Sequence, residues 1–164
     1  MKKLVIIIMT LAMVFSLTAC KTTDNESNIL DGSLEDILNK IYETADVDDD
    51  FKKYTKPSLQ NEEVTVERTQ YFLGKADIEF ESALASEPMM QPNAYSLVLV
   101  RVKKGADVEQ IKKDILDNVN PMKWICVGVE KENIIVDSIG DVVFLVMSND
   151  QAKPLHEAFV ALEK

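Results

Sequence analysis

The chain has 164 residues, of which 46% are hydrophobic and 28% charged, a composition typical of one ordinary globular domain. It carries 28 acidic against 18 basic side chains, for a formal net charge of −10. Affinity for nucleic acid comes largely from Lys and Arg that neutralise phosphates. The basic residues here are few and scattered, so we expect no nucleic-acid partner.

The first nineteen residues have the features of an export signal. Lys2 and Lys3 form a basic start, and the apolar run at residues 4–15 is interrupted only by Thr10. A helix that crosses a membrane needs about 20 apolar residues, so this run is too short. We therefore expect residues 1–19 to be a cleavable signal peptide.

The signal ends in Leu17-Thr18-Ala19-Cys20, which resembles the lipobox of bacterial lipoproteins. The resemblance implies that the Cys20 sulfur is acylated and that the signal is cut just before it. Two or more acyl chains anchor a protein stably, so we expect the membrane to be a partner through lipid on Cys20. The expected location is the outer face of the cytoplasmic membrane. The alternatives are an ordinary secretory signal that ends near a cysteine and an uncleaved signal anchor.

A polar segment follows the cysteine and has no apolar periodicity, so we expect residues 20–32 to be the lipidated Cys20 and a flexible tether. Residues 21–32 would reach about 40 Å if extended. Residues 33–164 are expected to form a single domain. Without the signal the chain has 16 basic and 28 acidic side chains, and hence a formal charge of −12.

The domain begins with a predicted helix at residues 33–44, where Ser33 can cap the first backbone N–H groups. The acids of residues 46–50 alternate as in a calcium loop, but the sixth position is Phe51 instead of Gly and the twelfth is Pro57 instead of Glu. We interpret this segment as a solvated acidic loop, with weak cation binding as the alternative.

The middle of the chain predicts a short helix and two strands. Residues 64–74 fit a strand or a two-turn helix with Thr65 as its cap, and we favour the helix. Residues 78–84 alternate as in a half-buried strand, which we expect the prolines of residues 86–93 to end. Residues 94–102 are the clearest strand in the sequence.

The last third predicts a helix, three strands and a final helix. Asp107 is the expected N-cap of the first helix, which Asn120-Pro121 stops. The last helix, residues 150–164, tolerates Pro154 in its first turn. The strands are expected at residues 123–130, 133–137 and 141–147, the last two joined by a hairpin.

This order predicts an α+β domain with a mainly antiparallel sheet of about five strands and helices packed on one face. With Cys20 acylated, only Cys126 remains, so no intramolecular disulfide is expected, and we interpret Cys126 as a small buried hydrophobe. His156 is the only histidine, so we expect no transition-metal site and no cofactor.

Three stretches, at residues 86–89, 123–127 and 137–141, resemble a family of small uncharacterised lipoproteins of Gram-positive bacteria, classed only as a domain of unknown function. The resemblance covers residues 33–162. It implies an exported, lipid-anchored single domain, and it brings no substrate or catalytic residue.

Four residues are candidates for ligand binding: Glu87, Met89, Trp124 and Asp141. Trp124 is either a core aromatic or a platform for stacking, with the core favoured. Met89 and its neighbour Met90 either form an adaptable contact surface or fill the core. The sequence favours a binding module that contacts an envelope protein, a peptide or a small ligand through its strand ends and residues 86–93.

The alternative function is an envelope hydrolase with a carboxylate pair. Glu79 and Glu81 share a strand face, and either could pair with Glu87 or Asp141 so that one carboxyl pKa rises. A solvated strand face explains the same acids. The single histidine and the lack of a nucleophile motif make us favour the binding module.

Overall fold

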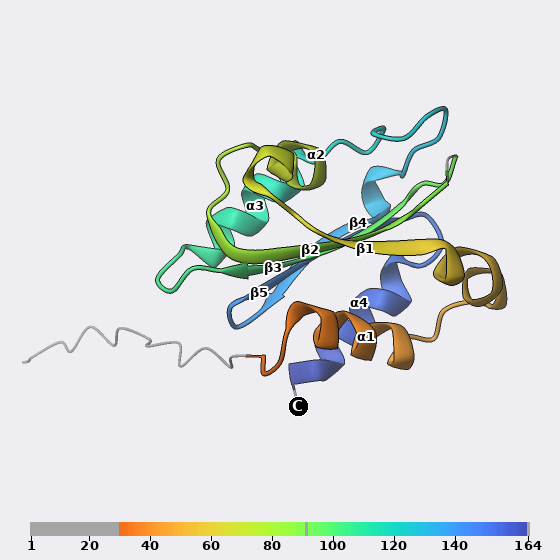
Figure 1. Cartoon of the computed structure of the whole chain (residues 1–164), viewed down its shortest axis with the longest axis horizontal. Coiled ribbons are helices and arrows are strands. Elements are labelled where there is room, and N and C mark those ends of the chain that lie inside the picture. Colours follow the sequence, from red (N-terminus) through yellow and green to blue (C-terminus); the bar gives the residue numbers. More distant parts are fainter. Residues whose placement is uncertain (1–29, 91, 164) are drawn as a thin grey trace, which may run out of the picture.

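The computed structural model describes residues 30–90 and 92–163, so the expected signal peptide, Cys20 and most of the tether lie outside the described residues. Within the described part, no helix combines the length and the apolar character needed to cross a membrane. The fold is α+β, with one five-stranded antiparallel sheet in the order β1-β2-β3-β5-β4 (Figure 1). The strands are β1 (Leu59–Glu63), β2 (Phe80–Pro88), β3 (Tyr95–Val102), β4 (Ile134–Ile139) and β5 (Val142–Ser148).

Helices cover both faces of the sheet, whereas the sequence led us to expect them on one face. The helices α1 and α4 lie on one face, and α2 and α3 lie on the other (Figure 1). The long helices are α1 (Leu34–Thr44), α3 (Val108–Asn118) and α4 (Ala152–Val160), and the short ones are α2 (Thr69–Leu73), η1 (Phe51–Thr55), η2 (Lys56–Ser58), η3 (Val66–Arg68), η4 (Lys131–Asn133) and η5 (Ala161–Glu163).

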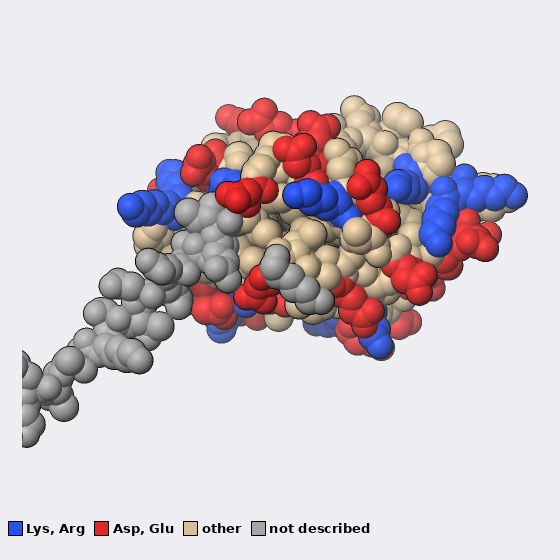
Figure 2. Space-filling view, turned by 90° about the horizontal axis from the view of Figure 1, so that it is seen from below, with Lys and Arg blue, Asp and Glu red and all other residues tan. Residues whose placement is uncertain are grey.

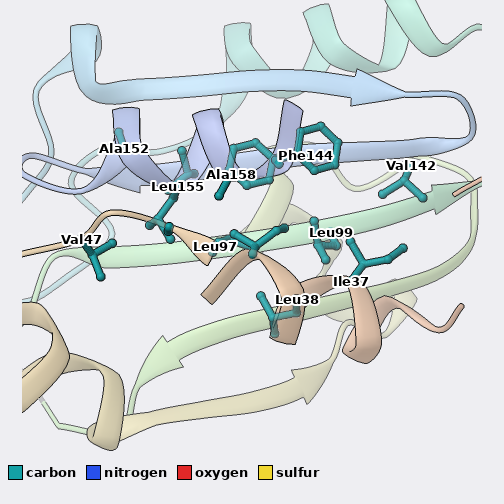
Figure 3. Close-up of a cluster of buried hydrophobic side chains, with 14 of the residues drawn as sticks. Ile37, Leu38, Val47, Leu97, Leu99, Val142, Phe144, Ala152, Leu155 and Ala158 are labelled. Carbon is teal, nitrogen blue, oxygen red and sulfur yellow. The ribbon is translucent and has the colours of Figure 1, made fainter. Parts of the chain in front are cut away.

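The two central strands show why both faces must be covered. In β3, Leu97 and Leu99 pack into the cluster between the sheet and the helices α1 and α4, while Val98 and Val100 pack into the cluster on the other face. Every residue of β5 is buried. Strands apolar on both sides need a layer on each side, which explains the four-helix cover. Figure 3 shows the first cluster, in which α1 and α4 place side chains against β3 and β5.

The caps expected for α1 and α3 are confirmed. The Ser33 side chain accepts a hydrogen bond from the Asp36 N–H at 3.1 Å, and the Asp36 carboxylate accepts one from the Ser33 N–H at 3.0 Å. The Asp107 carboxylate accepts from the Gln110 N–H at 3.0 Å. These local bonds fix where each helix begins.

The helix favoured at residues 64–74 is also present, as η3 and α2, and it ends at Gly74 with φ of +80°. A Cβ at this position would overlap the backbone of Asn118, so the close approach of α2 to the end of α3 requires glycine. The hairpin between β4 and β5 is a two-residue turn, and its first residue, Gly140, also has a positive φ.

The strand β2 extends further than expected. We predicted that residues 86–93 would break it, but Ser86, Glu87 and Pro88 all pair with β1. Pro88 is tolerated because it is the last residue of the strand. The partner β1 has no predicted counterpart, since its sequence, LQNEE, is that of a polar edge strand.

The prediction of a strand at residues 123–130 is wrong, because this segment is an irregular loop. None of residues 123–130 pairs with a strand of the sheet, although the side chains of Lys123 and Trp124 are both buried. Cys126 is exposed, not buried as expected, and has φ of +61°. The Val129 N–H donates to the Pro121 carbonyl at 2.9 Å, which closes the loop on itself.

Candidate functional site

The start of the domain is fixed to one end of the sheet by Arg101. Its guanidinium donates to the carbonyls of Leu30 at 3.1 Å and Gly32 at 2.9 Å, and to the Asp141 carboxylate at 2.8 Å. The charged groups of Arg101 and Asp141 are largely buried. We call this end, where β3 finishes and β4 turns into β5, the anchor end. Asp141, predicted as a binding residue, is therefore part of a structural ion pair.

The opposite end of the sheet is built from loops. From Arg101 back to Tyr95, the strand β3 spans about 20 Å. Around Tyr95 and the last residue of β5 lie four segments, residues 46–58, 89–94 without 91, 120–130 and 149–151, all at the right-hand end of Figure 1. We call these segments the loop end.

An open groove of about 850 Å³ lies at the loop end. Its lining comes from Asp48, Asp50, Phe51, Tyr54 and Thr55 and from residues 92–95, 127–128 and 148–151, so every segment of the loop end contributes. The Asp48 carboxylate accepts hydrogen bonds from the Gln151 side chain and from the Phe51 N–H, the latter at 2.7 Å. The Asp48 N–H in turn donates to the Gln151 side chain at 3.2 Å, which joins two walls of the groove.

Exposed apolar side chains concentrate at the same end. Among the described residues, nine large hydrophobic side chains are exposed, and five of them lie at the loop end. A soluble domain normally scatters such residues singly, so their grouping marks a contact surface. The five are Tyr54, Met89, Met90, Met122 and Ile125, each 62–72% exposed.

A buried ion pair holds the loop of residues 120–130 against the sheet. The Lys123 ammonium lies 2.5 Å from a Glu87 carboxylate oxygen, and the two side chains are only 3% and 11% exposed. Lys123 also donates to the Ser96 hydroxyl at 3.3 Å, and the Tyr71 hydroxyl donates to Glu87 at 3.2 Å. The ammonium lies 4.7–5.2 Å from the ring centroids of Tyr71, Phe72 and Trp124. We call these six residues the Lys123 cluster.

Charge burial in this cluster shifts two pKa values. Burial lowers the pKa of the Lys123 ammonium, and the Glu87 carboxylate offsets part of that shift. Burial, together with the negative Glu87, raises the pKa of Tyr71 to about 12. Trp124 is a core aromatic, as favoured from the sequence, and its Nε1 has no hydrogen-bond partner among the described residues. The cluster is thus an internal support for the loop.

The carboxylates considered for a hydrolase do not meet. Glu79 pairs with Lys103 at the start of β2, Glu87 pairs with Lys123 at the end of the same strand, and Asp141 pairs with Arg101. Glu81 is exposed on the outer part of β2. Each acid that has a partner is therefore held by its own cation.

His156 joins α4 to the edge of the sheet. Its Nε2 lies 2.7 Å from one Asp137 carboxylate oxygen, and the Lys112 ammonium lies 3.5 Å from the other. Burial acts to raise the pKa of Asp137, but the hydrogen bonds from His156 and from the Ser138 N–H outweigh it and lower that pKa. Across the described ranges, no group of three or more His, Cys, Asp or Glu residues is arranged to hold a metal ion.

The structure thus brings together three of the four predicted binding residues. Glu87 and Trp124 belong to the Lys123 cluster, Met89 lies beside it on the exposed surface, and Asp141 is at the other end. Sequence reasoning missed Tyr54 and Gln151 as groove residues. No local pattern marks them, because the groove joins segments more than 100 residues apart.

Comparisons with protein-family models, with curated proteins and with solved structures find no match for this chain.

Proposed function

We propose that the protein is an exported, lipid-anchored binding module that contacts a partner in the cell envelope through its loop end. The supporting observation is the placement of the large exposed apolar side chains: of the nine within residues 30–90 and 92–163, five lie at the end of the sheet opposite Arg101. Large apolar side chains gathered beside an open groove are characteristic of a contact surface.

The position of Leu30 gives the proposed orientation. Arg101 holds the Leu30 carbonyl at the anchor end, so a chain that continues to a lipid on Cys20 leaves the domain there. Residues 21–29 would span at most about 30 Å. The anchor end would then face the membrane, and the loop end would face away from it. The lipobox at residues 17–20 and the family resemblance support the lipid anchor in this proposal.

The lipid anchor on Cys20 is tested by mass spectrometry of the protein from the membrane fraction. We expect the chain to begin at Cys20 and to carry acyl chains, and we expect Cys20→Ala to leave the N-terminal signal uncut and without lipid. An intact, unmodified Cys20 in the natural protein would refute the anchor.

The contact surface is tested by site-specific photo-crosslinking in native membranes. A photoreactive residue at Met89, at the loop end, is compared with one at Lys104, which is exposed beyond β3 at the anchor end. We expect a defined crosslinked envelope component from position 89 and not from position 104. Equal crosslinking from both positions, or from position 104 alone, would contradict the proposed orientation.

A further inference from the structure

We infer that the groove at the loop end takes an extended peptide segment in which Lys or Arg residues alternate with apolar residues. This inference rests on the proposed function, because it names the kind of envelope partner that the loop end would bind. Three features carry it: the charge of the groove's lining, the exposed apolar side chains at the same end of the sheet and the open shape of the groove.

The lining of the groove is acidic. Three carboxylates, those of Asp48, Asp50 and Asp150, line it, and none of the described Lys or Arg residues does. None of the three forms an ion pair with another described residue. The hydrogen bonds that Asp48 accepts come from neutral donors, so its charge is not compensated either. A cationic group in the groove would supply the missing positive charge.

The apolar side chains suit the rest of a basic peptide. Lys and Arg carry long aliphatic stems that lie along apolar surface while the charged head stays near water. Tyr54 already holds such a cation, since the Lys53 ammonium lies 4.8 Å from its ring centroid. Met89 and Met90 are flexible and polarisable, so they adapt to apolar partners of irregular shape.

The shape of the groove favours a peptide over a compact solute. Pockets for small molecules enclose most of the ligand surface. This groove is open to solvent and has about 850 Å³, with contributions from four separate segments. An extended chain makes many shallow contacts along such a surface. Its successive side chains point to opposite sides, so Lys or Arg residues can face the lining carboxylates while the apolar residues face the exposed apolar side chains of the loop end.

Nearby lysines limit the strength of the attraction. Lys52, Lys53 and Lys56 are exposed on η1 and η2 and do not line the groove. Figure 2 shows Lys and Arg side chains next to acidic ones at the right-hand end of the molecule. These lysines lie within about one Debye length of the groove, so they weaken its attraction for a distant cation. We therefore expect selectivity for the peptide to depend on direct contact with the lining carboxylates.

The test measures fluorescence anisotropy of labelled peptides with the full chain in nanodiscs of zwitterionic lipid, with empty nanodiscs as the background. Three peptides of equal length are compared: alternating Lys and Leu, alternating Glu and Leu, and alternating Lys and Ser. Asp50→Asn and Asp150→Asn remove groove charges, and Asp31→Asn is the matched control, since Asp31 is exposed near the anchor end. Free lysine amide tests whether a cation alone binds.

We expect the Lys and Leu peptide to bind best, and each groove substitution to weaken its binding about two- to fivefold, the range of exposed charge pairs. Asp31→Asn should change nothing. Binding of the Glu and Leu peptide as tight as that of the Lys and Leu peptide, or no effect of the groove substitutions, would overturn the inference. Binding of lysine amide as tight as that of the peptide would also overturn it.

Failure of the inference is distinguishable from failure of the proposed function. If the basic peptide does not bind but position 89 still crosslinks an envelope component, the partner has a different chemistry and the binding module stands. If position 89 also fails to crosslink, both are refuted.

Discussion

The ion pair between Lys123 and Glu87 makes a quantitative prediction about the loop end. Lys123→Met keeps most of the side-chain volume against the three aromatic rings but removes the ammonium. The Glu87 carboxylate, 11% exposed, is then left without a cation. Breaking a buried pair in this way costs about 3–5 kcal/mol. We expect the lower part of this range, since Glu87 keeps its hydrogen bond from Tyr71.

The double substitution Lys123→Met with Glu87→Gln separates the charge from the packing. It removes both charges and leaves an amide that still accepts a hydrogen bond from Tyr71. We expect the double variant to lose about 2 kcal/mol less unfolding free energy than the sum of the two single losses, because it leaves no buried charge without a partner. Lys113→Met is the matched control. Lys113 forms an exposed pair with Asp117, and its loss should leave the unfolding midpoint unchanged.

Urea unfolding of the purified chain measures these effects. Trp124 is the only tryptophan and lies against Lys123, so its fluorescence reports on the loop, and circular dichroism reports on the whole domain. We expect the urea midpoint of Lys123→Met to be lower than that of the natural chain, with an unchanged dependence of the unfolding free energy on urea concentration. If Lys123→Met has no more effect than Lys113→Met, or if the double variant loses the full sum of the single effects, the pair does not hold the loop as argued.

The pair also has a pH signature. Burial lowers the pKa of Lys123 in the folded protein, while in the unfolded chain it is near 10.4. At pH values between these two pKa values, Lys123 binds its proton more strongly in the unfolded chain than in the folded one. Its contribution to the stability of the folded state therefore increases as the pH rises. Lys123→Met should lack that rise.

Two further predictions concern single positions. Gly74→Ala should destabilise the fold by more than about 1 kcal/mol, and by more than Gly105→Ala does. Both glycines have a positive φ, but only a Cβ at Gly74 would meet the backbone of Asn118. Thermal unfolding of the two variants measures the difference. Burial raises the pKa of Tyr42 to about 12 and that of Tyr95 well above its usual value. The unfolded chain therefore ionises first, and the free energy of unfolding should fall as the pH rises above about 10, in step with tyrosinate absorbance; a flat profile would refute this.

The elements predicted correctly are those with local signals. The caps at Ser33 and Asp107 involve residues three positions apart, so the sequence shows them directly. The strand β3 was identified because its β-branched and apolar residues are continuous. That same continuity indicates burial on both faces, and it is the signal that could have predicted helices on each side of the sheet.

The elements predicted wrongly depend on distant partners. The polar residues of β1 form a strand because the backbone of β2 is available, with Leu59 opposite Pro88. The apolar residues after Pro121 resemble a strand, yet Lys123 turns inward because Glu87, 36 residues earlier in the chain, provides its counter-charge. A pattern read along the chain contains neither of these pairings.

The available surfaces of the domain explain why a partner would use the loop end. Both sheet faces are covered by helices, and the anchor end is closed by Arg101, Asp141 and the start of the domain. At the β4 edge, Asp137 is held by a cation from one helix layer and a histidine from the other. The β1 edge presents the polar sequence LQNEE, whose two acids disfavour strand addition. The loop end differs in that its apolar side chains are exposed over a supported loop, and such a surface gains most from burial against another molecule.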